Sequence, residues 1–263
     1  MATNLQSMFF KRGEGPSSDV ISRNELLRGL LAVPDVARDL RSDLKLVHLE
    51  VNQVLYESGD KIDVVYFPID SVVSSLAIME DGTTLETSMV GHEGLVGVSS
   101  ILGSGLSRQW MWVTVGGTAV QLDVGLLDKV FVQNEVALKL LLRCYRSLVM
   151  QVSQRCVCNT RHTILERLCC WLLMIHDRVG ATNLKLTQET IASRIGARRA
   201  GITVAAGMLQ DMHAIEYRRG QLHIGGRDIL EQMVCECYSL LAIEQYSPHR
   251  PTFRLPHYKR ITG

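Results

Sequence analysis

Residues 184–226 constrain the fold more than any other part of the sequence, because three patterns follow one another there without a gap. Thr187 is a good N-cap for a short helix, QETIASRI, and Gly196 supplies the turn after it. A second helix is predicted from Arg198 to Met212. Alternating apolar residues on either side of an RRG tip then predict a β-hairpin over residues 215–224. Helix, turn, helix and hairpin in this order predict a winged helix-turn-helix.

The second predicted helix has an apolar face and an opposite face of small and polar residues. Successive side chains are about 100° apart around a helix axis, so one arc is expected to be buried; it carries Ile202, Ala205, Leu209 and Met212. The opposite arc is expected to enter a DNA major groove, whose width admits one helix; it carries Arg199, Ala200, Thr203, Val204 and Gly207.

Positive charge is concentrated in this region. The whole chain has a formal net charge of only +1, but between Lys185 and Arg227 seven Lys and Arg residues outnumber three acidic ones. Arg198 and Arg199 lie together at a helix N-terminus, where an exposed positive charge costs about 0.3–1 kcal/mol unless an anion such as phosphate binds there. The residues predicted to contact double-stranded DNA are Thr187, Gln188, Arg198, Arg199, Ala200, Thr203, Val204, Arg218 and Arg219.

The pattern of apolar and turn-forming residues changes between residues 47 and 124. Short β-rich runs such as VVYFPI, VVSSLAIM and MWVTV alternate with turn signals such as ESGD, EDGT and GSGLS. This pattern predicts an antiparallel sandwich or roll. Before it, residues 1–24 are predicted to form an irregular arm, and residues 25–46 two short helices interrupted by Pro34.

A long helix is predicted over residues 127–160. Its apolar positions alternate between spacings of four and three, which is typical of the seam between two paired helices: they are Leu127, Phe131, Asn134, Leu138, Leu141, Tyr145, Leu148 and Val152, with Asn134 the one polar member. We interpret this segment as a dimerisation helix in which Asn134 fixes the register. A core helix that spans its own domain remains the alternative.

The predicted domains follow from these patterns. Thr163 and Glu166 form a capping-box pattern that starts a new helix, which ends at Gly180. We therefore expect a β-roll domain over residues 25–126, the dimerisation helix over 127–160 and the winged helix-turn-helix over 161–239. Residues 240–263 are expected to form a basic tail that also contacts phosphate, with Arg250, Arg254, Lys259 and Arg260 in it.

Composition narrows the class of protein. The chain of 263 residues is 46% hydrophobic and 21% charged, as folded proteins are, and has no apolar run long enough to span a membrane. Its seven cysteines show neither a disulfide ladder nor paired CxxC motifs, so a reducing, cytoplasmic location is expected. The two C-x-C pairs are interpreted as small buried residues, and no metal site is predicted. No catalytic motif is present, so an enzyme is not expected.

The LTQETIASRIGARRAGIT segment, after a β-roll and a long helix, resembles the transcription regulators of the cyclic-AMP receptor protein and fumarate-nitrate reductase regulator (Crp-Fnr) family. The resemblance spans about Leu26 to Tyr238 and includes VLYESGD, VYFPIDSVVS, VGHEGLVG and GRDILEQMVCECY. It implies an α+β chain with a cyclic-nucleotide-binding-like β-roll. It also implies a homodimer joined through the central helix, bound to two-fold related DNA half-sites and in contact with RNA polymerase.

The resemblance also implies how DNA bases are read. Arg199 matches the first base-reading Arg of the family, but Ala200 replaces the Glu that follows it and Val204 replaces a second Arg. Direct readout is thereby reduced to Arg199, which can grip guanine O6 and N7, with contributions from Thr203 and Arg198. Ala200 and Val204 are suited to contact thymine methyl groups. We expect a pseudo-palindromic operator that relies more on DNA shape.

The family's cyclic-nucleotide cassette is only partly retained, in the segment GVSSILGSGLSRQW. The effector-pocket positions implied by the resemblance are Gly97, Val98, Ser99, Arg108, Gln109, Val152 and Ser153. Val98 replaces the Glu that binds the ribose hydroxyl, and an unpaired buried hydroxyl costs about 1–3 kcal/mol. Cyclic AMP is therefore disfavoured. The segment is interpreted either as an ordinary turn, with Arg108 paired to a carboxylate, or as a site for another small-molecule effector.

Other sensors and functions are less consistent with the sequence. No cysteine precedes Cys144, which argues against the iron-sulfur sensor of the family. His48 and His92 are interpreted as structural rather than as haem ligands. The alternative function is a nucleotide-binding regulatory module that acts through protein contacts without DNA, but it leaves the helix-turn-helix and the wing unexplained.

Overall fold

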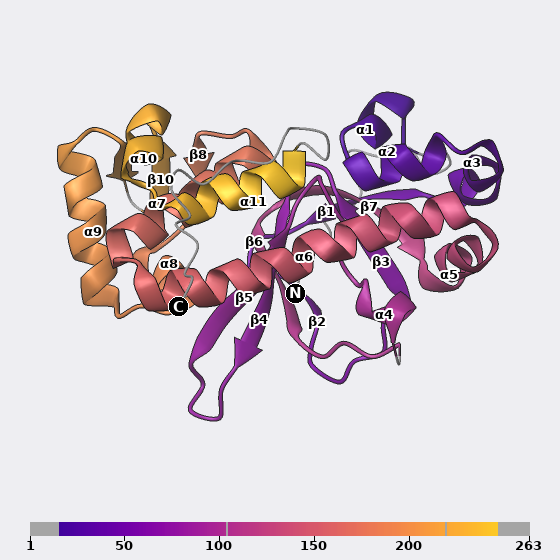
Figure 1. The fold of residues 1–263 in the computed structure, drawn as a ribbon, viewed down its shortest axis with the longest axis horizontal. Helices are drawn as coiled ribbons and strands as arrows, with labels where there is room; N and C mark the ends of the chain where they lie inside the picture. Colours follow the sequence, from indigo (N-terminus) through magenta and orange to yellow (C-terminus); the bar gives the residue numbers. More distant parts are fainter. Residues whose placement is uncertain (1–15, 104, 219, 247–263) are drawn as a thin grey trace, which may run out of the picture. The chain divides into compact units, whose positions relative to one another are not determined.

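The computed structural model describes residues 16–103, 105–218 and 220–246. The beginning of the predicted arm and the basic residues of the predicted tail lie outside this range. The chain divides into two compact units, one of Met1–Val73 with Val90–Leu142 and the other of Ser74–Met89 with Arg143–Gly263 (Figure 1).

Three short helices open the first unit: α1 (Ser18–Ser22), α2 (Glu25–Leu31) and α3 (Pro34–Leu40), followed by a 3-10 turn, η1 (Arg41–Asp43). The two helices expected over residues 25–46 are confirmed, whereas α1 corrects the prediction of an arm that is irregular up to residue 24. Asn24 caps α2 and is fully buried, and its Nδ2 donates to the carbonyls of Pro68 and Gly94 over 2.9 and 3.0 Å. These bonds fasten α2 to the β-roll.

Seven strands build the predicted antiparallel roll: β1 (Lys45–Leu49), β2 (Val54–Tyr56), β3 (Val64–Pro68), β4 (Val72–Ile78), β5 (Thr84–Val90), β6 (Trp110–Val115) and β7 (Gly117–Asp123). They form sheets of order β1-β7-β3 and β2-β6-β4-β5. In the first sheet Val47 pairs with Ala119 and Val65 with Leu122. Alternate residues of these strands point inward, so Val65, Phe67, Val120 and Leu122 form the core. The short helix α4 (Ser99–Leu102) lies between β5 and β6.

The long helix predicted over residues 127–160 is not continuous. It is divided into α5 (Val124–Gln133) and α6 (Glu135–Arg161) by Asn134, whose φ of −128° and ψ of 108° are extended. The side-chain oxygen of Asn134 accepts a hydrogen bond from the backbone N–H of Ala137 over 3.0 Å, so this residue caps α6. Because it ends one helix and starts the next, Asn134 is not a register residue within a single seam.

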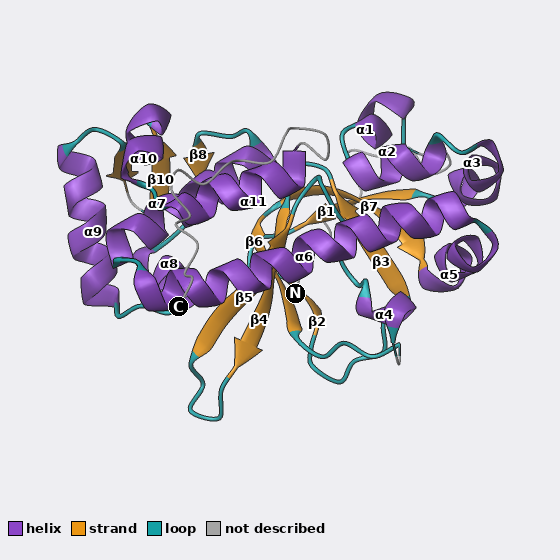
Figure 2. Cartoon of the chain, viewed as in Figure 1, coloured by secondary structure: helices purple, strands orange, loops and turns teal. Residues whose placement is uncertain are grey.

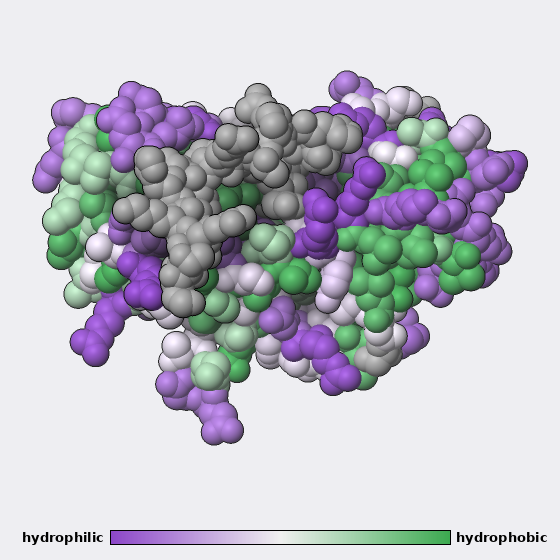
Figure 3. Space-filling model, viewed as in Figure 1, coloured by the Kyte–Doolittle hydropathy of each residue, from purple (hydrophilic) through white to green (hydrophobic). Residues whose placement is uncertain are grey.

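The exposed apolar surface of α6 coincides with the predicted seam only in part, at Tyr145 and Val152. Leu127, Phe131 and Leu141 are buried in the first unit and contribute to its own core. The exposed apolar residues of α6 instead include Leu142, Tyr145, Val149 and Val152, at spacings of three, four and three. We call these four residues the α6 stripe. In the space-filling view, hydrophobic residues gather over the N-terminal half of α6 and around α5 (Figure 3).

The second unit contains most of the β4–β5 hairpin, the C-terminal part of α6 and the predicted winged domain (Figure 2). The elements of that domain are α7 (Ile164–Val179), β8 (Asn183–Leu184), α8 (Gln188–Ile195), α9 (Arg199–Asp211), β9 (Ile215–Arg218), β10 (Gln221–Ile224), α10 (Arg227–Met233) and α11 (Glu236–Tyr246). The capping box of Thr163 and Glu166 is confirmed at the start of α7, and Gly180 ends that helix with a φ of 64°.

A buried carboxylate connects three elements of the second unit. Glu86 on β5 is fully buried and accepts hydrogen bonds from Ser74 Oγ on β4 over 2.5 Å and from Trp171 Nε1 on α7 over 3.0 Å. Arg155 on α6 forms an ion pair with it, at 2.7 Å from Nη2 to Oε1. A buried charge is tolerated only when it is paired and hydrogen-bonded, and this carboxylate is both.

Replacing Glu86 by Gln should lower the free energy of unfolding by about 3 kcal/mol, because the largely buried guanidinium of Arg155 then lacks its countercharge. Urea denaturation measures the change. The matched control is Glu80→Gln in the exposed turn of the same hairpin, which should stay within about 0.5 kcal/mol of the wild type. If the Glu86→Gln chain is as stable as the wild type, the Glu86 carboxylate does not stabilise the second unit as described.

Candidate nucleic-acid interface

Helix α8 and the turn after it form as the sequence predicts. Thr187 is the N-cap of α8, and its Oγ1 accepts from the backbone N–H of Thr190 over 3.1 Å. Gly196 ends the helix in the left-handed conformation, with a φ of 68°. A Cβ at this position would also lie 2.5 Å from Leu85 Cδ1 of the β4–β5 hairpin. Gly196 is therefore required both for its backbone angle and for this close contact.

Helix α9 extends over Arg199–Asp211, with Arg198 as its N-cap. Ile202, Ala205 and Leu209 are buried as predicted, but Met212 is 39% exposed, so the prediction that it is buried is wrong. Met212 is the C-cap of α9 and lies at the edge of the buried arc, in which Ala206 is almost fully enclosed. The helix ends before Met212 can be brought to the core.

The face predicted to read DNA is exposed on α9. Arg198, Arg199, Ala200 and Thr203 are exposed, and Val204 is 60% exposed, while Gly207 is half-buried. An exposed valine between small and polar neighbours is suited to apolar contact with a thymine methyl group. The structure thus presents this predicted set of side chains together on one helical surface.

Polar contacts connect α8 and α9 across this surface. Thr203 Oγ1 donates to Gln188 Oε1 over 2.8 Å. Arg199 Nε lies 3.7 Å from Glu189 Oε2, and both side chains are more than 70% exposed. This ion pair was not predicted. An exposed pair contributes only about 0–1 kcal/mol, so Arg199 can leave Glu189 for a phosphate or a base at small cost.

The predicted wing is confirmed as an antiparallel hairpin. Tyr217 of β9 pairs with Leu222 of β10, and β8 adds a third, unpredicted strand through Leu184. Gly220 has a φ of 79° at the tip, where Arg219 lies outside the described residues. Arg218 lies 2.6 Å from Glu216, from Nη2 to Oε1, on an exposed surface.

Two of the basic residues counted from the sequence do not add charge to this surface. Arg194 is only 4% exposed, and burial lowers its pKa while Glu86 opposes that shift. Arg227 pairs with Asp177 over 2.7 Å and with Glu231 over 2.8 Å. The count from sequence therefore overestimates the local positive charge, because side chains distant in sequence neutralise or enclose part of it.

The predicted effector residues are divided between the two units. In the first unit, Gly97 has a φ of 98°, and a Cβ there would lie 3.2 Å from Val65 Cγ1. It leads through Val98 into α4, which Ser99 starts. Arg108 is exposed and Gln109 half-buried. Within the described part of the chain no carboxylate pairs with Arg108, so the structure does not support that part of the ordinary-turn interpretation. Val152 and Ser153 are exposed on α6, in the second unit.

The domain that carries this surface matches a known protein family. Residues 166–233, from the first turn of α7 to the end of α10, match the model of a Crp-like helix-turn-helix domain. A global nitrogen regulator of Nostoc sp. is 23% identical over 185 residues, 66% of this chain and 82% of that protein. The global nitrogen regulator of Synechococcus elongatus is 21% identical over 69% of this chain and 86% of its own length.

Solved structures show the same fold. FixK2 from Bradyrhizobium japonicum has a TM-score of 0.62 at 15% identity, covering 73% of this chain and 98% of its own. A CRP-family transcriptional regulator from Thermus thermophilus has a TM-score of 0.59 at 15% identity, covering 71% of this chain and 95% of its own. The resemblance noted in the sequence is confirmed for the C-terminal domain: residues 166–233 are a Crp-like helix-turn-helix domain, and the relatives that match about two thirds of the chain are named as global nitrogen regulators. The proteins that the chain matches are transcription regulators rather than enzymes. No described helix is long and apolar enough to cross a membrane.

Proposed function

We propose that two copies of this chain bind a pseudo-palindromic operator, with α9 of each copy in the major groove and the wing against the phosphate backbone. The observation that carries the proposal is the exposed face of α9, which offers Arg198 and Arg199 at its N-terminus and small or apolar residues after them. A major groove admits such a helix, and arginines bind both phosphate and guanine. RNA polymerase is the protein partner that the family resemblance supports.

Base reading depends mainly on Arg199 in this proposal. Ala200 and Val204 offer no hydrogen bonds to bases, and Thr203 already donates to Gln188 over 2.8 Å. Arg199 pairs with Glu189, which is exposed and therefore weakly held. On DNA, Arg199 exchanges this carboxylate for the O6 and N7 atoms of a guanine. Contacts from Ala200 and Val204 to thymine methyl groups and the local DNA shape supply the remaining specificity.

Arg199→Ala should weaken binding to the best genomic fragment by about 5- to 150-fold, the equivalent of one bidentate base contact. Glu189→Gln should strengthen it by about two- to five-fold, because it removes both the competing ion pair and a negative charge near phosphate. Genomic fragments are first selected by binding to the wild type, and affinities are then measured by gel shift at one fixed salt concentration.

The control for this experiment is Arg38→Ala, because Arg38 is an exposed arginine of α3, in the first unit; its affinity should equal that of the wild type. Unchanged binding by Arg199→Ala would overturn the assignment of base reading. A wild-type chain that shifts no duplex DNA even at low salt would instead favour the alternative of a regulatory module that acts through protein contacts alone.

The α6 stripe supports dimerisation through the central helix. It keeps Tyr145 and Val152 of the predicted seam, with Leu142 and Val149 in place of Leu141 and Leu148. Leu142, Tyr145, Val149 and Val152 lie within an arc of roughly 80° on one side of α6, at the alternating spacing of paired helices. Cys156, also exposed, continues the spacing by four. Two such stripes packed against each other would bury apolar surface that a single chain exposes, and would place two copies of α9 for two half-sites.

Val149→Glu should convert the dimer to a monomer, because a carboxylate in the middle of the paired stripe would be desolvated without a partner. The oligomeric state is measured by light scattering during size-exclusion chromatography. Met150→Glu is the matched control, because Met150 is exposed on the same helix about 120° away from the middle of the stripe. A Val149→Glu chain that stays dimeric would contradict this interface.

The sensor is proposed not to hold cyclic AMP in the manner usual for the family. Val98 offers no acceptor for a ribose hydroxyl, and loss of such a partner costs about 1–3 kcal/mol. Arg108 is exposed and suited to bind an anionic group. A small-molecule effector other than cyclic AMP is therefore proposed to bind at this segment. A calorimetric titration that showed micromolar affinity for cyclic AMP would overturn it.

A further inference from the structure

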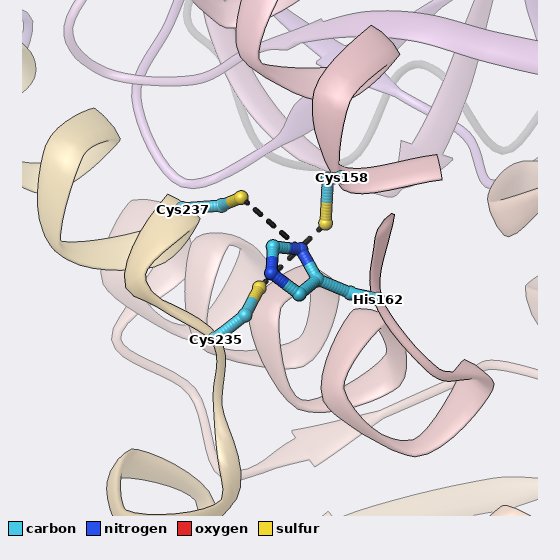
Figure 4. A group of neighbouring side chains, drawn as sticks. All are labelled: Cys158, His162, Cys235 and Cys237. Carbon is cyan, nitrogen blue, oxygen red and sulfur yellow. Dashed lines mark hydrogen bonds between the residues drawn. The ribbon is translucent and has the colours of Figure 1, made fainter. Parts of the chain in front are cut away.

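Three thiols and one imidazole converge at the start of α11, within the second unit (Figure 4). They belong to Cys158, His162, Cys235 and Cys237, which we call the CCHC cluster. The cysteines of the two C-x-C pairs are predicted from the sequence to be small buried residues; Cys158, Cys235 and Cys237 are buried, whereas Cys156 is exposed. The structure also brings together one ligand atom from each side chain of the cluster, with all four atoms within 4.8 Å of one another.

Local structure explains how these side chains meet. Cys158 and His162 are four residues apart at the end of α6, and the backbone N–H of His162 bonds to the carbonyl of Cys158 over 3.1 Å. Their side chains therefore lie one helical turn apart on the same face. Cys235 directly precedes α11 and Cys237 lies in its first turn, and the backbone N–H of Tyr238 bonds to the carbonyl of Cys235 over 3.2 Å. Two local pairs, 73 residues apart in the chain, thus complete one cluster.

Two of the separations between ligand atoms match those of a tetrahedral site. Cys158 Sγ lies 3.6 Å from Cys235 Sγ, and His162 Nδ1 lies 3.4 Å from Cys237 Sγ. Zinc bound at about 2.3 Å from sulfur and about 2.0 Å from nitrogen would set these separations at about 3.8 and about 3.5 Å. The two observed distances agree with these values to within a few tenths of an ångström.

The surroundings of the cluster are those of a metal site as well. His162 turns its Nδ1 toward the thiols, while its Nε2 lies 3.3 Å from Glu236 Oε2, and a carboxylate on the second ring nitrogen is the usual support of a metal-bound histidine. Gln154 Nε2 donates to Cys237 Sγ over 3.1 Å. A zinc ion with three thiolates and one imidazole carries a net charge of −1, and Arg167 lines the same small cavity as Cys158 and Cys237.

We infer that the CCHC cluster is a structural zinc site that joins the end of α6 to the start of α11. Three soft thiolates and an imidazole are a preferred ligand set for Zn²⁺, and the four protein ligands leave no position open for a substrate. All three cysteines are buried, which is typical of a closed structural site. Bound zinc would hold the C-terminal helix α11 against the helix that carries the α6 stripe.

The first test is the metal content of the full-length chain, purified under reducing conditions and passed through metal-free buffer. Inductively coupled plasma mass spectrometry should find about one zinc per chain. Cys237→Ser and His162→Ala should each reduce the zinc content at least about ten-fold. Cys156→Ser should retain the metal, because Cys156 is exposed and lies in the same C-x-C pair as Cys158.

A second control separates the proposed ligands from a neighbouring thiol. Cys170 on α7 is buried and interacts with both Cys158 and Cys235 without belonging to the cluster. Cys170→Ser should keep its zinc. Loss of zinc from Cys170→Ser together with retention by His162→Ala would overturn the assignment of the imidazole as the fourth ligand.

The wild-type chain gives a test that does not depend on the folding of a variant. After removal of zinc with a chelator, Co²⁺ should restore one equivalent of metal, with the visible bands of tetrahedral cobalt and a near-ultraviolet band from three thiolates. It should also raise the melting temperature of the chelated protein. A purified chain without zinc that takes up no cobalt, or one isolated with a Cys158–Cys235 disulfide, would overturn the proposal.

Discussion

The buried carboxylate of Glu86 organises the second unit, because donors from three elements satisfy it at once. Ser74, Arg155 and Trp171 approach it from β4, α6 and α7. One turn before Arg155 on α6, Gln151 bonds to both backbone groups of Met89 on β5. The hairpin is thus fixed to α6 and α7 by buried polar contacts, and an apolar substitute at Glu86 would leave the guanidinium of Arg155 without its countercharge. The positions of the helices that follow depend on this arrangement.

The surface of α8 and α9 that is proposed to bind DNA is positioned by these contacts of the hairpin. Leu85, next to Glu86, occupies the space that a side chain at Gly196 would need, so the hairpin sets the turn between α8 and α9. Gly201 in turn lets α9 approach α7, where a Cβ would lie 2.6 Å from Ile164 Cδ1. These two glycines therefore allow α8, α9 and α7 to pack closely. The opposite face of α9 carries Arg199 and its small neighbours. Specificity from so few polar groups requires that the helix be placed accurately.

The sequence was informative wherever local patterns decide the structure. Periodicity, caps and turn residues predicted α8, α9 and the wing, because each depends on residues close together in the chain. Features set by tertiary packing were missed. Asn134 divides the central helix, Arg194 is buried among residues distant in sequence, and Met212 lies just beyond the end of α9. The CCHC cluster was missed because its two halves are 73 residues apart, although a C-x3-H pair at the end of a helix was a visible signal.

Arg199 is proposed to carry the direct reading of bases. Replacement of single guanines by 7-deazaguanine in the selected operator tests it most directly, because the change removes the N7 acceptor that a bidentate arginine needs and leaves base pairing intact. The wild type should lose about five-fold or more in affinity at one guanine of each half-site, and Arg199→Ala should be indifferent to the same replacement. Equal sensitivity of the two proteins at that guanine would contradict the account.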